Sequence, residues 1–250
     1  MIRRLLPVVF SLVLPRAASA AALYLEVKDC RRPAEEGEFL QTCVKVVSGP
    51  KAGTILGPGS VAPSGQAAAV LHHRRYGSPS DRLVVKVYGT GGRLSGSYPM
   101  GSGGDEFPLQ WTPPPSRYLG WVEVDGRGGL LRIVDCRRRR FALSAASPLE
   151  EWPIFAPHGA RALIPKRAPT TDGSSDVVRA MEMVSLDGPP QRQTVIQTGP
   201  EEELVQIHWL SPTELGATRR KVGASKGQTV VGKWRAAKPP DLQPEPSPEE

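Results

Sequence analysis

The pattern of hydrophobic and polar positions contains one type of segment that occurs four times along this chain, and we call it the proline phrase. Each time, an aromatic or apolar residue leads into a short turn that contains proline, and small apolar residues follow the turn. The turns lie roughly 45 to 55 residues apart, a period typical of β-propeller blades and similar arrays. The phrases lie at 61–71, 110–121, 153–167 and 208–218, and their turn prolines are Pro63, Pro114, Pro157 and Pro212.

A second pattern repeats in phase with the first. Pairs of apolar stretches separated by Gly-rich or polar turns predict β-hairpins over residues 84–98, 130–144 and 180–196. Each hairpin follows its proline phrase by a similar interval. By propensity residues 177–184 could form a short helix instead, but their place in the repeat favours a strand. Two features that recur together indicate repeated structural units.

Strand patterns on either side of these units extend the array. Residues 23–27 alternate, 41–47 follow as a second strand and 54–56 fit a returning strand, so the first unit resembles a blade without its first strand. A shorter fifth unit covers residues 205–234. We therefore expect an all-β fold of antiparallel four-stranded sheets, β-propeller-like, with about five blades, some of them incomplete. A β-sandwich and an open arc are alternatives, and the first and last units could complete one blade together.

Two of the phrases resemble the turn-and-strand signature of TolB-type β-propellers. In that family an aromatic or apolar residue precedes a Ser-Pro-Asp-Gly-like turn and a strand, and residues 155–163 and 209–215 follow this order. Residues 184–188 are similar to the hairpin that follows in the family. The sequence departs from the family at the acidic residue of the turn. The resemblance covers most of residues 59–220 and implies an exported repeat protein with a partial or atypical propeller.

The two ends of the chain differ in composition from the repeats. Arg3 and Arg4 precede an apolar run of about ten residues, and Ala18-Ser-Ala20 offers small residues for cleavage, as in a secretory signal peptide over 1–20. The run is too short to span a bilayer, which needs about 20 residues; a buried N-terminal helix is the alternative. We expect a β-propeller-like domain over 21–236 and a disordered Pro- and Glu-rich tail over 237–250. The protein is then periplasmic or secreted and not membrane-spanning.

Net charge bears on the partner of the protein. The chain carries a formal charge of +7, while the tail holds one lysine against four acidic residues, so the excess lies in the body. Arg137, Arg138, Arg139 and Arg140 form a cluster that is a candidate for contacting an anion. The cluster lacks interleaved aromatic residues, and an exported protein meets little nucleic acid. We expect an envelope protein or another anionic ligand as the partner, and no nucleic acid.

The three cysteines meet an oxidising environment if the chain is exported. Cys30 and Cys43 flank a polar connection and are the first choice for a local disulfide, while other pairings stay open. Cys136 would then be left over beside the arginine cluster. Because nearby positive charge lowers the pKa of a thiol, Cys136 is a candidate reactive thiol. A hairpin turn with solvated arginines beside a half-buried thiol is the plainer interpretation.

No constellation of catalytic or metal-binding residues stands out in the sequence. The histidines at 72, 73, 158 and 208 lack the spacing of a zinc motif, and no G-x-S-x-G elbow is present. We therefore expect no catalytic, cofactor-binding or metal-binding residues, and no cofactor. Trp111 and Trp209 occupy the same position of the repeat, which predicts packing between blades. Trp121, Trp152 and Trp234 fit either the core or a sugar-binding groove.

The absence of such a constellation favours a non-enzymatic function. The export pattern and the repeats indicate an interaction module that presents blade-end loops to a partner in the cell envelope. The alternative is a hydrolase or lyase that acts on cell-envelope polymers from a site in a propeller cleft, which rests on analogy of fold alone.

Overall fold

Apart from one short 3₁₀ turn, the described elements are all β-strands. Residues 177–184 lie within a strand, so the strand interpretation is confirmed and the helix alternative is wrong. The computed structural model describes residues 22–34, 37–73, 83–100, 108–124, 128–147, 153–157, 160–173, 175–187 and 191–235, with the side chains at 28–41, 73 and 124 excepted. The elements are β1 (Tyr24–Ala34), β2 (Gly37–Val46), β3 (Ile55–Val61), β4 (Ala68–His73), β5 (Leu83–Gly89), η1 (Thr90–Gly92), β6 (Arg93–Pro99), β7 (Gln110–Trp111), β8 (Tyr118–Val124), β9 (Gly129–Asp135), β10 (Arg140–Ser147), β11 (Arg161–Pro169), β12 (Asp176–Ser185), β13 (Arg192–Gln197), β14 (Glu202–Ser211), β15 (Glu214–Lys221) and β16 (Gln228–Lys233).

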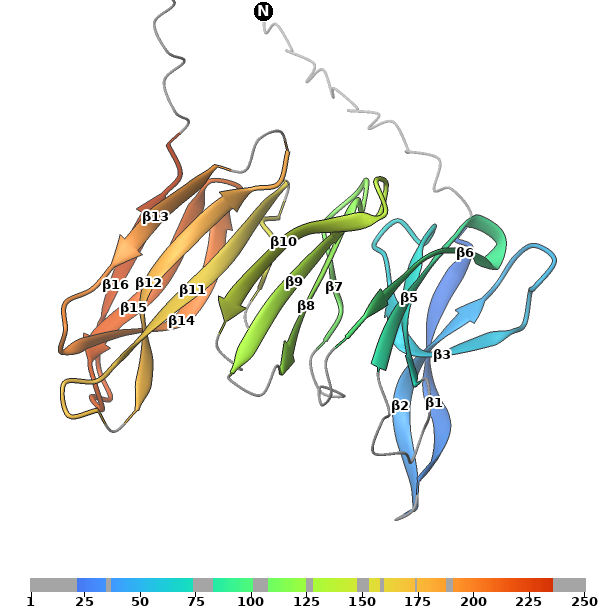
Figure 1. Cartoon of the computed structure of the whole chain (residues 1–250), viewed down its shortest axis with the longest axis horizontal. Helices are drawn as coiled ribbons and strands as arrows, with labels where there is room; N and C mark the ends of the chain where they lie inside the picture. The colour runs from blue at the N-terminus through green and yellow to red at the C-terminus, as the bar shows by residue number, and fades with distance from the viewer. Residues whose placement is uncertain are drawn as a thin grey trace, which may run out of the picture.

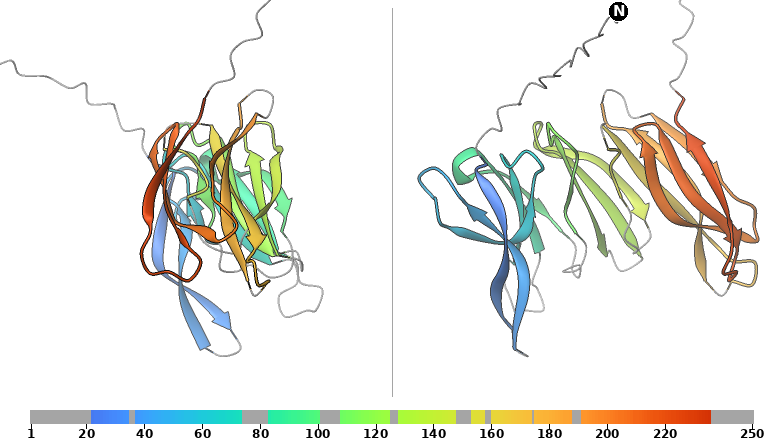
Figure 2. Two further views of the ribbon diagram at one scale, coloured as in Figure 1. Left: turned by 90° about the vertical axis from the view of Figure 1, so that its left-hand side faces the viewer. Right: turned by 180° about the vertical axis from the view of Figure 1, so that it is seen from behind.

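The strands form antiparallel meanders that follow one another in chain order. One sheet has the order β1-β2-β3-β4-β5-β6, the next β10-β9-β8-β7, and the last two β11-β12-β13 and β14-β15-β16. Figures 1 and 2 show β1 to β6 at one end of the long axis and β14 to β16 at the other. The all-β antiparallel fold is confirmed, in the form of an open arc. The idea that the first and last units complete one blade is wrong, because they lie at opposite ends.

The number of strands per sheet departs from the expected four. In the fourth unit an isolated bridge between Phe155 and Ala162 stands where a first strand was expected, and β11, β12 and β13 supply the rest. The first and second units share β3 and merge into a six-stranded sheet. Residues 55–58 of β3 pair with β2, and residues 59–61 pair with β4. The predicted strand at 54–56 is thus the start of a longer strand that connects two units.

Each proline phrase forms the same kind of β-hairpin, one in each of four successive units, and this confirms the repeat. Its turn joins β3 to β4, β7 to β8, β14 to β15 and the Phe155 bridge to β11. The residue that leads into the turn pairs with an apolar residue of the returning strand, and such cross-strand pairs stabilise a sheet. The pairs are Val61 with Ala68, Trp111 with Leu119, Phe155 with Ala162 and Trp209 with Leu215.

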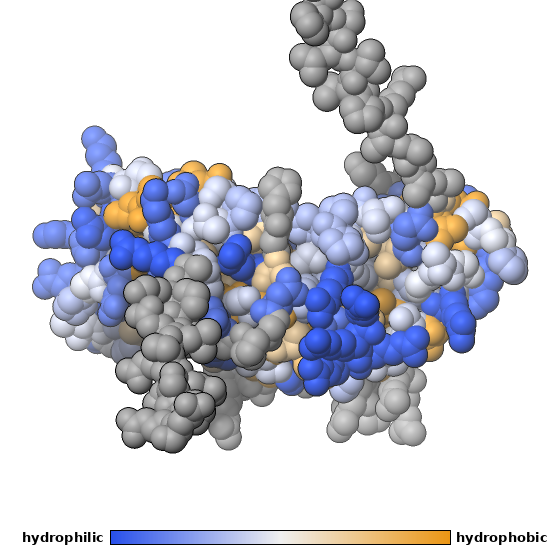
Figure 3. All heavy atoms as spheres, turned by 90° about the horizontal axis from the view of Figure 1, so that it is seen from above, coloured by the Kyte–Doolittle hydropathy of each residue, from blue (hydrophilic) through white to orange (hydrophobic). Residues whose placement is uncertain are grey.

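The second repeated pattern, the hairpin, supplies another turn at the same end of the first three sheets. These turns join β5 to β6, β9 to β10 and β12 to β13. Since strands in a meander alternate in direction, the turn after the first strand and the turn after the third lie at one end. We call this end of the molecule the loop end. It is the upper end in Figure 1 and faces the viewer in Figure 3.

Packing between successive sheets buries both faces of the inner strands. In β8, Tyr118 and Val122 join a large cluster with residues of β9 to β15, while Leu119 and Trp121 join a second cluster with residues of β4 to β6. Trp121 is fully buried, so it belongs to the core. A third cluster lies among β1, β2 and β4. The sequences of the inner strands are therefore nearly continuous apolar runs, because water reaches neither face of these strands.

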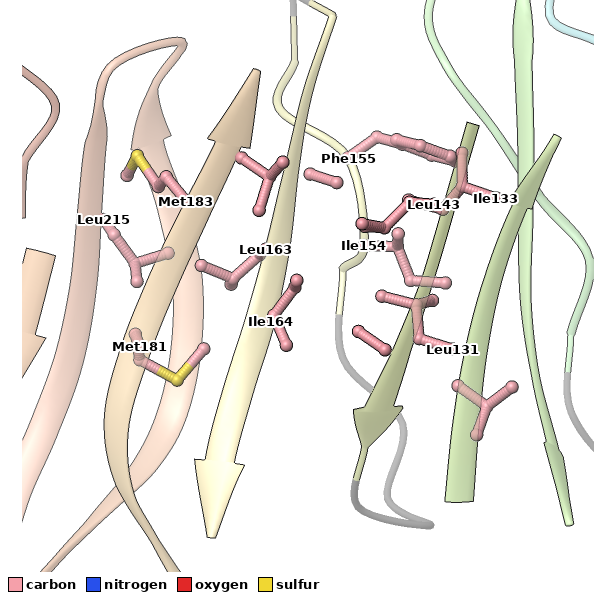
Figure 4. Packing of buried hydrophobic residues seen from close by; sticks show 14 of the residues in the cluster. Leu131, Ile133, Leu143, Ile154, Phe155, Leu163, Ile164, Met181, Met183 and Leu215 are labelled. Carbon is pink, nitrogen blue, oxygen red and sulfur yellow. The ribbon is translucent and has the colours of Figure 1, made fainter. Parts of the chain in front are cut away.

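The same alternation is visible in β11, farther along the arc. Figure 4 shows Leu163 on the side of Met181 and Leu215, and Ile164 on the side of Ile154. All five side chains are fully or almost fully buried. Burying one such side chain contributes roughly 1.5–3 kcal/mol, so this packing is a main source of stability.

Two tryptophans at the same repeat position tie neighbouring units together. The indole Nε1–H of Trp111 donates to the carbonyl of Ser60 at 3.3 Å, and that of Trp209 donates to the carbonyl of Pro153 at 3.0 Å. Trp111 is buried and Trp209 is partly buried against the large cluster. The predicted packing between blades is confirmed for both residues. Trp234 is also partly buried, with the guanidinium of Arg161 5.4 Å from its ring.

Gly59 marks the point where β3 passes from one unit to the next, and we expect its substitution to destabilise the protein. A Cβ at this position would lie 2.0 Å from the carbonyl oxygen of Ala69. Because both groups belong to paired backbone, a Gly59→Ala variant should lose about 1–3 kcal/mol, as overpacked cores do. Thermal unfolding followed by circular dichroism measures the loss. Gly89→Ala is the control, since a Cβ there meets nothing within 4 Å; equal stability of the two variants would contradict the expectation.

Candidate functional site: an arginine-lined groove at the loop end

Three hollows adjoin one another at the loop end. The first, of about 240 Å³, lies between the β7–β8 turn and Asp187 of the next sheet, and the second, of about 330 Å³, lies between the same turn and the ends of β5 and β6. The third, of about 250 Å³, lies between the β5–β6 turn and Arg139. The first and second hollows share Pro115 and Arg117, and the second and third share Gly89 and Ser95. Together they lie in a row across three sheets, and we call this row of adjoining hollows the loop-end groove.

Arg117 fixes the turns that form the groove. Its Nε and Nη2 donate to the Asp135 carboxylate, the shortest of these contacts being 2.7 Å, and its Nη1 donates to Asp187 Oδ1 at 2.8 Å. The hydroxyl of Tyr118 donates to the carbonyl of Leu186 at 2.8 Å and lies 3.0 Å from Asp187 Oδ1. One guanidinium thereby joins the second sheet to the third. A bidentate, partly buried pair of this kind is among the stronger side-chain contacts.

The electrostatics of this network follow from burial and from the number of donors. Asp135 is 3% exposed. Burial raises the pKa of its carboxyl, but hydrogen bonds from Arg117 and from the backbone N–H groups of Arg137 and Arg138 outweigh burial, so the pKa is lowered. Burial, with the nearby Asp187, raises the pKa of Tyr118 to about 12. At neutral pH the carboxylate is therefore charged and the phenol is neutral.

Asp135 also holds the turn that carries the arginine cluster. By accepting from the backbone N–H groups of Arg137 and Arg138 at 3.0 and 3.1 Å, its Oδ1 fixes residues 136–139 with all four cluster arginines exposed. Arg138 lies 3.9 Å from the Asp135 carboxylate, whereas Arg137 and Arg139 form no ion pair with the described residues. Arg137 lines the second hollow and Arg139 the third. In Figure 3 a strongly hydrophilic area covers the middle of this face.

Only two of the four predicted anion-contacting residues therefore line the groove. Arg137 and Arg139 line it, while Arg138 and Arg140 are exposed beside it. Sequence reasoning missed Arg93 and Arg117, which line the groove from other turns. Both residues flank repeated turns, Arg93 directly after the β5–β6 turn and Arg117 directly after a proline turn. A search for arginines at turn-flanking positions of the repeat would have found them.

Cys136 has a different chemistry from the one expected of a reactive thiol. Burial, followed by the negative charge of Asp135, raises the pKa of its thiol to about 12. The arginine cluster was expected to lower this pKa, and the direction is the opposite because the sulfur lies against the second cluster while the guanidinium groups extend into water. The thiol is free and half-buried, as in the plainer interpretation.

The proposed disulfide falls partly outside the described side chains. The backbone of Cys30 lies in β1 and that of Cys43 in the neighbouring β2, where Cys43 pairs with Val27 and Cys30 with Gln41 across a bulge. Cys43 is fully buried. The side chain of Cys30 is not described, so the pairing stays a prediction.

The histidines do not converge on the groove within the described part of the chain. His72 and His208 are exposed, and Nδ1 of His208 lies 2.9 Å from the carbonyl of Gln206. His158, Trp152 and the side chain of His73 lie outside the described residues. Among the residues that are described, no three His, Cys, Asp or Glu side chains gather as metal ligands would, and no helix could span a membrane.

No family model and no curated protein matches this chain. Solved structures resemble it in part. A hydrazine synthase from Kuenenia stuttgartiensis aligns over 76% of this chain and 61% of its own, with 11% identity and a TM-score of 0.43. KlHsv2 with loop 6CD replaced by a Gly-Ser linker aligns over 78% and 62%, with 9% identity and a TM-score of 0.33. A protein provisionally named TolB from Agrobacterium tumefaciens aligns over 83% and 77%, with 11% identity and a TM-score of 0.31.

This chain spans less than two thirds of the length of the first two structures. The three TM-scores are below 0.5.

Asp135→Asn is expected to destabilise the protein at pH 7 by about 1–3 kcal/mol, since it weakens the charge-assisted hydrogen bonds of Arg117, which is partly exposed and keeps Asp187 as a partner. A lowered carboxyl pKa contributes stability that is present above the unfolded-state pKa and is lost as pH falls through the folded-state pKa. The difference between wild type and variant should therefore shrink below pH ~4. Urea unfolding at pH 7 and pH 3 measures it; a difference independent of pH would contradict the role of the ionised carboxylate.

We expect native Cys136 to react with iodoacetamide at least a hundredfold more slowly at pH 8 than a cysteine in a short peptide. With a pKa of about 12 against an ordinary value near 8.5, almost none of its sulfur is thiolate. Peptide mass spectrometry over a time course measures the rate, with urea-unfolded protein as the control. A native rate equal to the unfolded one would show that neither burial nor Asp135 suppresses the thiolate.

Proposed function

We propose that this chain is a β-repeat interaction module that binds an anionic partner through the loop-end groove. The observation that carries the proposal is the set of arginines that line adjoining hollows: Arg93, Arg117, Arg137 and Arg139. Of these, Arg117 is bound to Asp135 and Asp187, and the other three form no ion pair with the described residues. Unpaired guanidinium groups along a groove attract an acidic ligand and give it an orientation.

The construction of the groove supports binding by turns on a rigid scaffold. The turns rest on sheets whose faces are buried, and contacts such as that of Arg117 with Asp187 join one sheet to the next. Loops held in this way are frequent carriers of recognition residues. In the open arc the loop ends of several sheets also lie side by side (Figure 1).

The setting of this function is a further part of the proposal. The signal-peptide pattern of residues 1–20 and the TolB-type phrases support an exported protein, periplasmic or secreted, with an envelope protein as the anionic partner. Residues 1–20 and 237–250 lie outside the described part of the chain.

The enzymatic alternative, a hydrolase or lyase of envelope polymers, gains no support from the groove. Convergent carboxylates or histidines would have favoured it. The one carboxylate that lines the described hollows is Asp187, which is occupied by Arg117 and Tyr118. We therefore propose binding without catalysis.

Reversing two charges of the groove is expected to weaken binding of an acidic polymer. Fluorescently labelled poly-L-glutamate should bind the full chain, and its dissociation constant should rise at least tenfold in the double variant Arg137→Glu, Arg139→Glu. Fluorescence anisotropy at about 0.1 M salt measures the affinity, which should fall further as salt rises because the contacts are partly exposed.

The matched control is Lys221→Glu with Lys226→Glu, which changes the net charge equally. Both lysines are exposed, and they flank the turn between β15 and β16, outside the groove. This control should change the affinity by less than threefold. Equal losses in the two double variants would mean that net charge alone governs binding and would contradict the proposal.

A further inference from the structure

The second hollow of the groove differs from the other two in having mainly apolar walls. Ala67, Val87, Tyr88 and Pro115 line it, together with the half-buried thiol of Cys136. It lies where the β5–β6 sheet meets the β7–β8 turn, and its volume of about 330 Å³ exceeds that of either neighbour. Because Cys136 keeps its proton, the thiol acts here as a small, nearly apolar surface.

Ser116 belongs to the wall of this hollow, and its hydroxyl oxygen is covered by the surrounding protein. Its residue is 6% exposed, and its hydroxyl has no hydrogen-bond partner among the described residues, while its backbone N–H donates to the carbonyl of Pro113. Its φ of 53° lies in the left-handed region, which a serine adopts only under constraint. A buried hydroxyl left without a partner is costly, and such groups gather at sites that bind ligands.

Positive charge at the rim of the hollow favours a ligand that carries negative charge. Arg137 lines the rim with its guanidinium free of ion pairs among the described residues, and Arg139 follows in the adjoining hollow. Asp135 does not neutralise this rim, since its two oxygens already accept from Arg117 and from the turn backbone. An anionic group of a ligand would therefore meet Arg137 at the rim, and an apolar group beside it would meet the apolar walls inside.

From these groups we infer that the second hollow takes an apolar side chain of an acidic peptide, with a neighbouring carboxylate of the peptide on Arg137. This inference rests on the proposed function and names its ligand more closely. The hollow adjoins one neighbour at Pro115 and Arg117 and the other at Gly89 and Ser95, which line both hollows of each pair. An extended chain can occupy successive hollows, with apolar contact in the middle one and acidic residues beside the arginines on either side.

Two acetylated, amidated peptides test the inference on the full chain. Glu-Glu-Leu-Glu-Glu carries the apolar side chain, and Glu-Glu-Gly-Glu-Glu lacks it at the same charge. We expect the leucine peptide to bind at least tenfold more tightly, which is the effect of burying one leucine side chain. Isothermal titration calorimetry measures both affinities. Equal affinities would overturn the inference but leave the proposed function standing, whereas no binding of either peptide would overturn both.

Substitutions in the hollow locate the effect. Ala67→Phe should fill the hollow and reduce the difference between the two peptides to less than threefold. Arg137→Gln should weaken both peptides at least fivefold, and Arg138→Gln, which changes another exposed arginine of the same turn outside the hollow, should weaken them less than twofold. Equal losses in the two glutamine variants would overturn the assignment of Arg137.

Ser116→Ala tests whether an apolar group enters the hollow. Because the Ser116 hydroxyl has no partner among the described residues and a leucine side chain offers it none, the variant should bind the leucine peptide equally or more tightly, and its unfolding temperature should stay equal to or above that of wild type. A more than threefold loss of affinity at an unchanged unfolding temperature would show that a polar group of the ligand enters the hollow and would overturn the inference.

Discussion

Each sheet of this protein is too thin to shield its apolar side chains from water on both sides, and the next sheet supplies the missing cover. The residues of β8 show the consequence, since Tyr118 and Val122 face one neighbour while Leu119 and Trp121 face the other. In β4, Ala69 belongs to one cluster and Val70 to another. Stability is therefore shared between adjacent units, as in other repeat proteins, and only the third cluster of the described residues lies within a single sheet, the six-stranded one.

Stacking also decides where recognition residues can meet. A meander brings the turn after its first strand and the turn after its third strand to one end, and stacking places that end beside the same end of the next sheet. Arg117 leaves the first kind of turn, and Arg93 and Arg139 leave the second kind. The loop-end groove is thus a product of the packing that buries the core, and its arginines lie on turns fixed by contacts such as that of Asp135.

Periodicity in the sequence was sufficient to predict the hairpins, because each phrase contains both members of a cross-strand pair, as in Trp111 with Leu119. The shared strand could not be predicted in this way. Its path depends on Gly59 approaching the backbone of Ala69, a contact between strands that no local pattern encodes. For the same reason, the sequence predicted only those residues of the groove that are adjacent in the chain. The run Arg137–Arg140 was visible, whereas Ser116 and Arg93 lie in different units and reach the groove only through the order of the sheets.

Cys136 shows why adjacency in sequence is a poor guide to electrostatics. Four arginines follow it, and counting charges along the chain predicts a lowered pKa. In the fold these side chains are exposed, where water and salt screen them, while the sulfur lies against an apolar cluster and beside a carboxylate. Burial and Asp135 act in the same direction and exceed the screened arginines. The arginines therefore leave the thiol protonated, and their charge is directed outward, to whatever enters the groove.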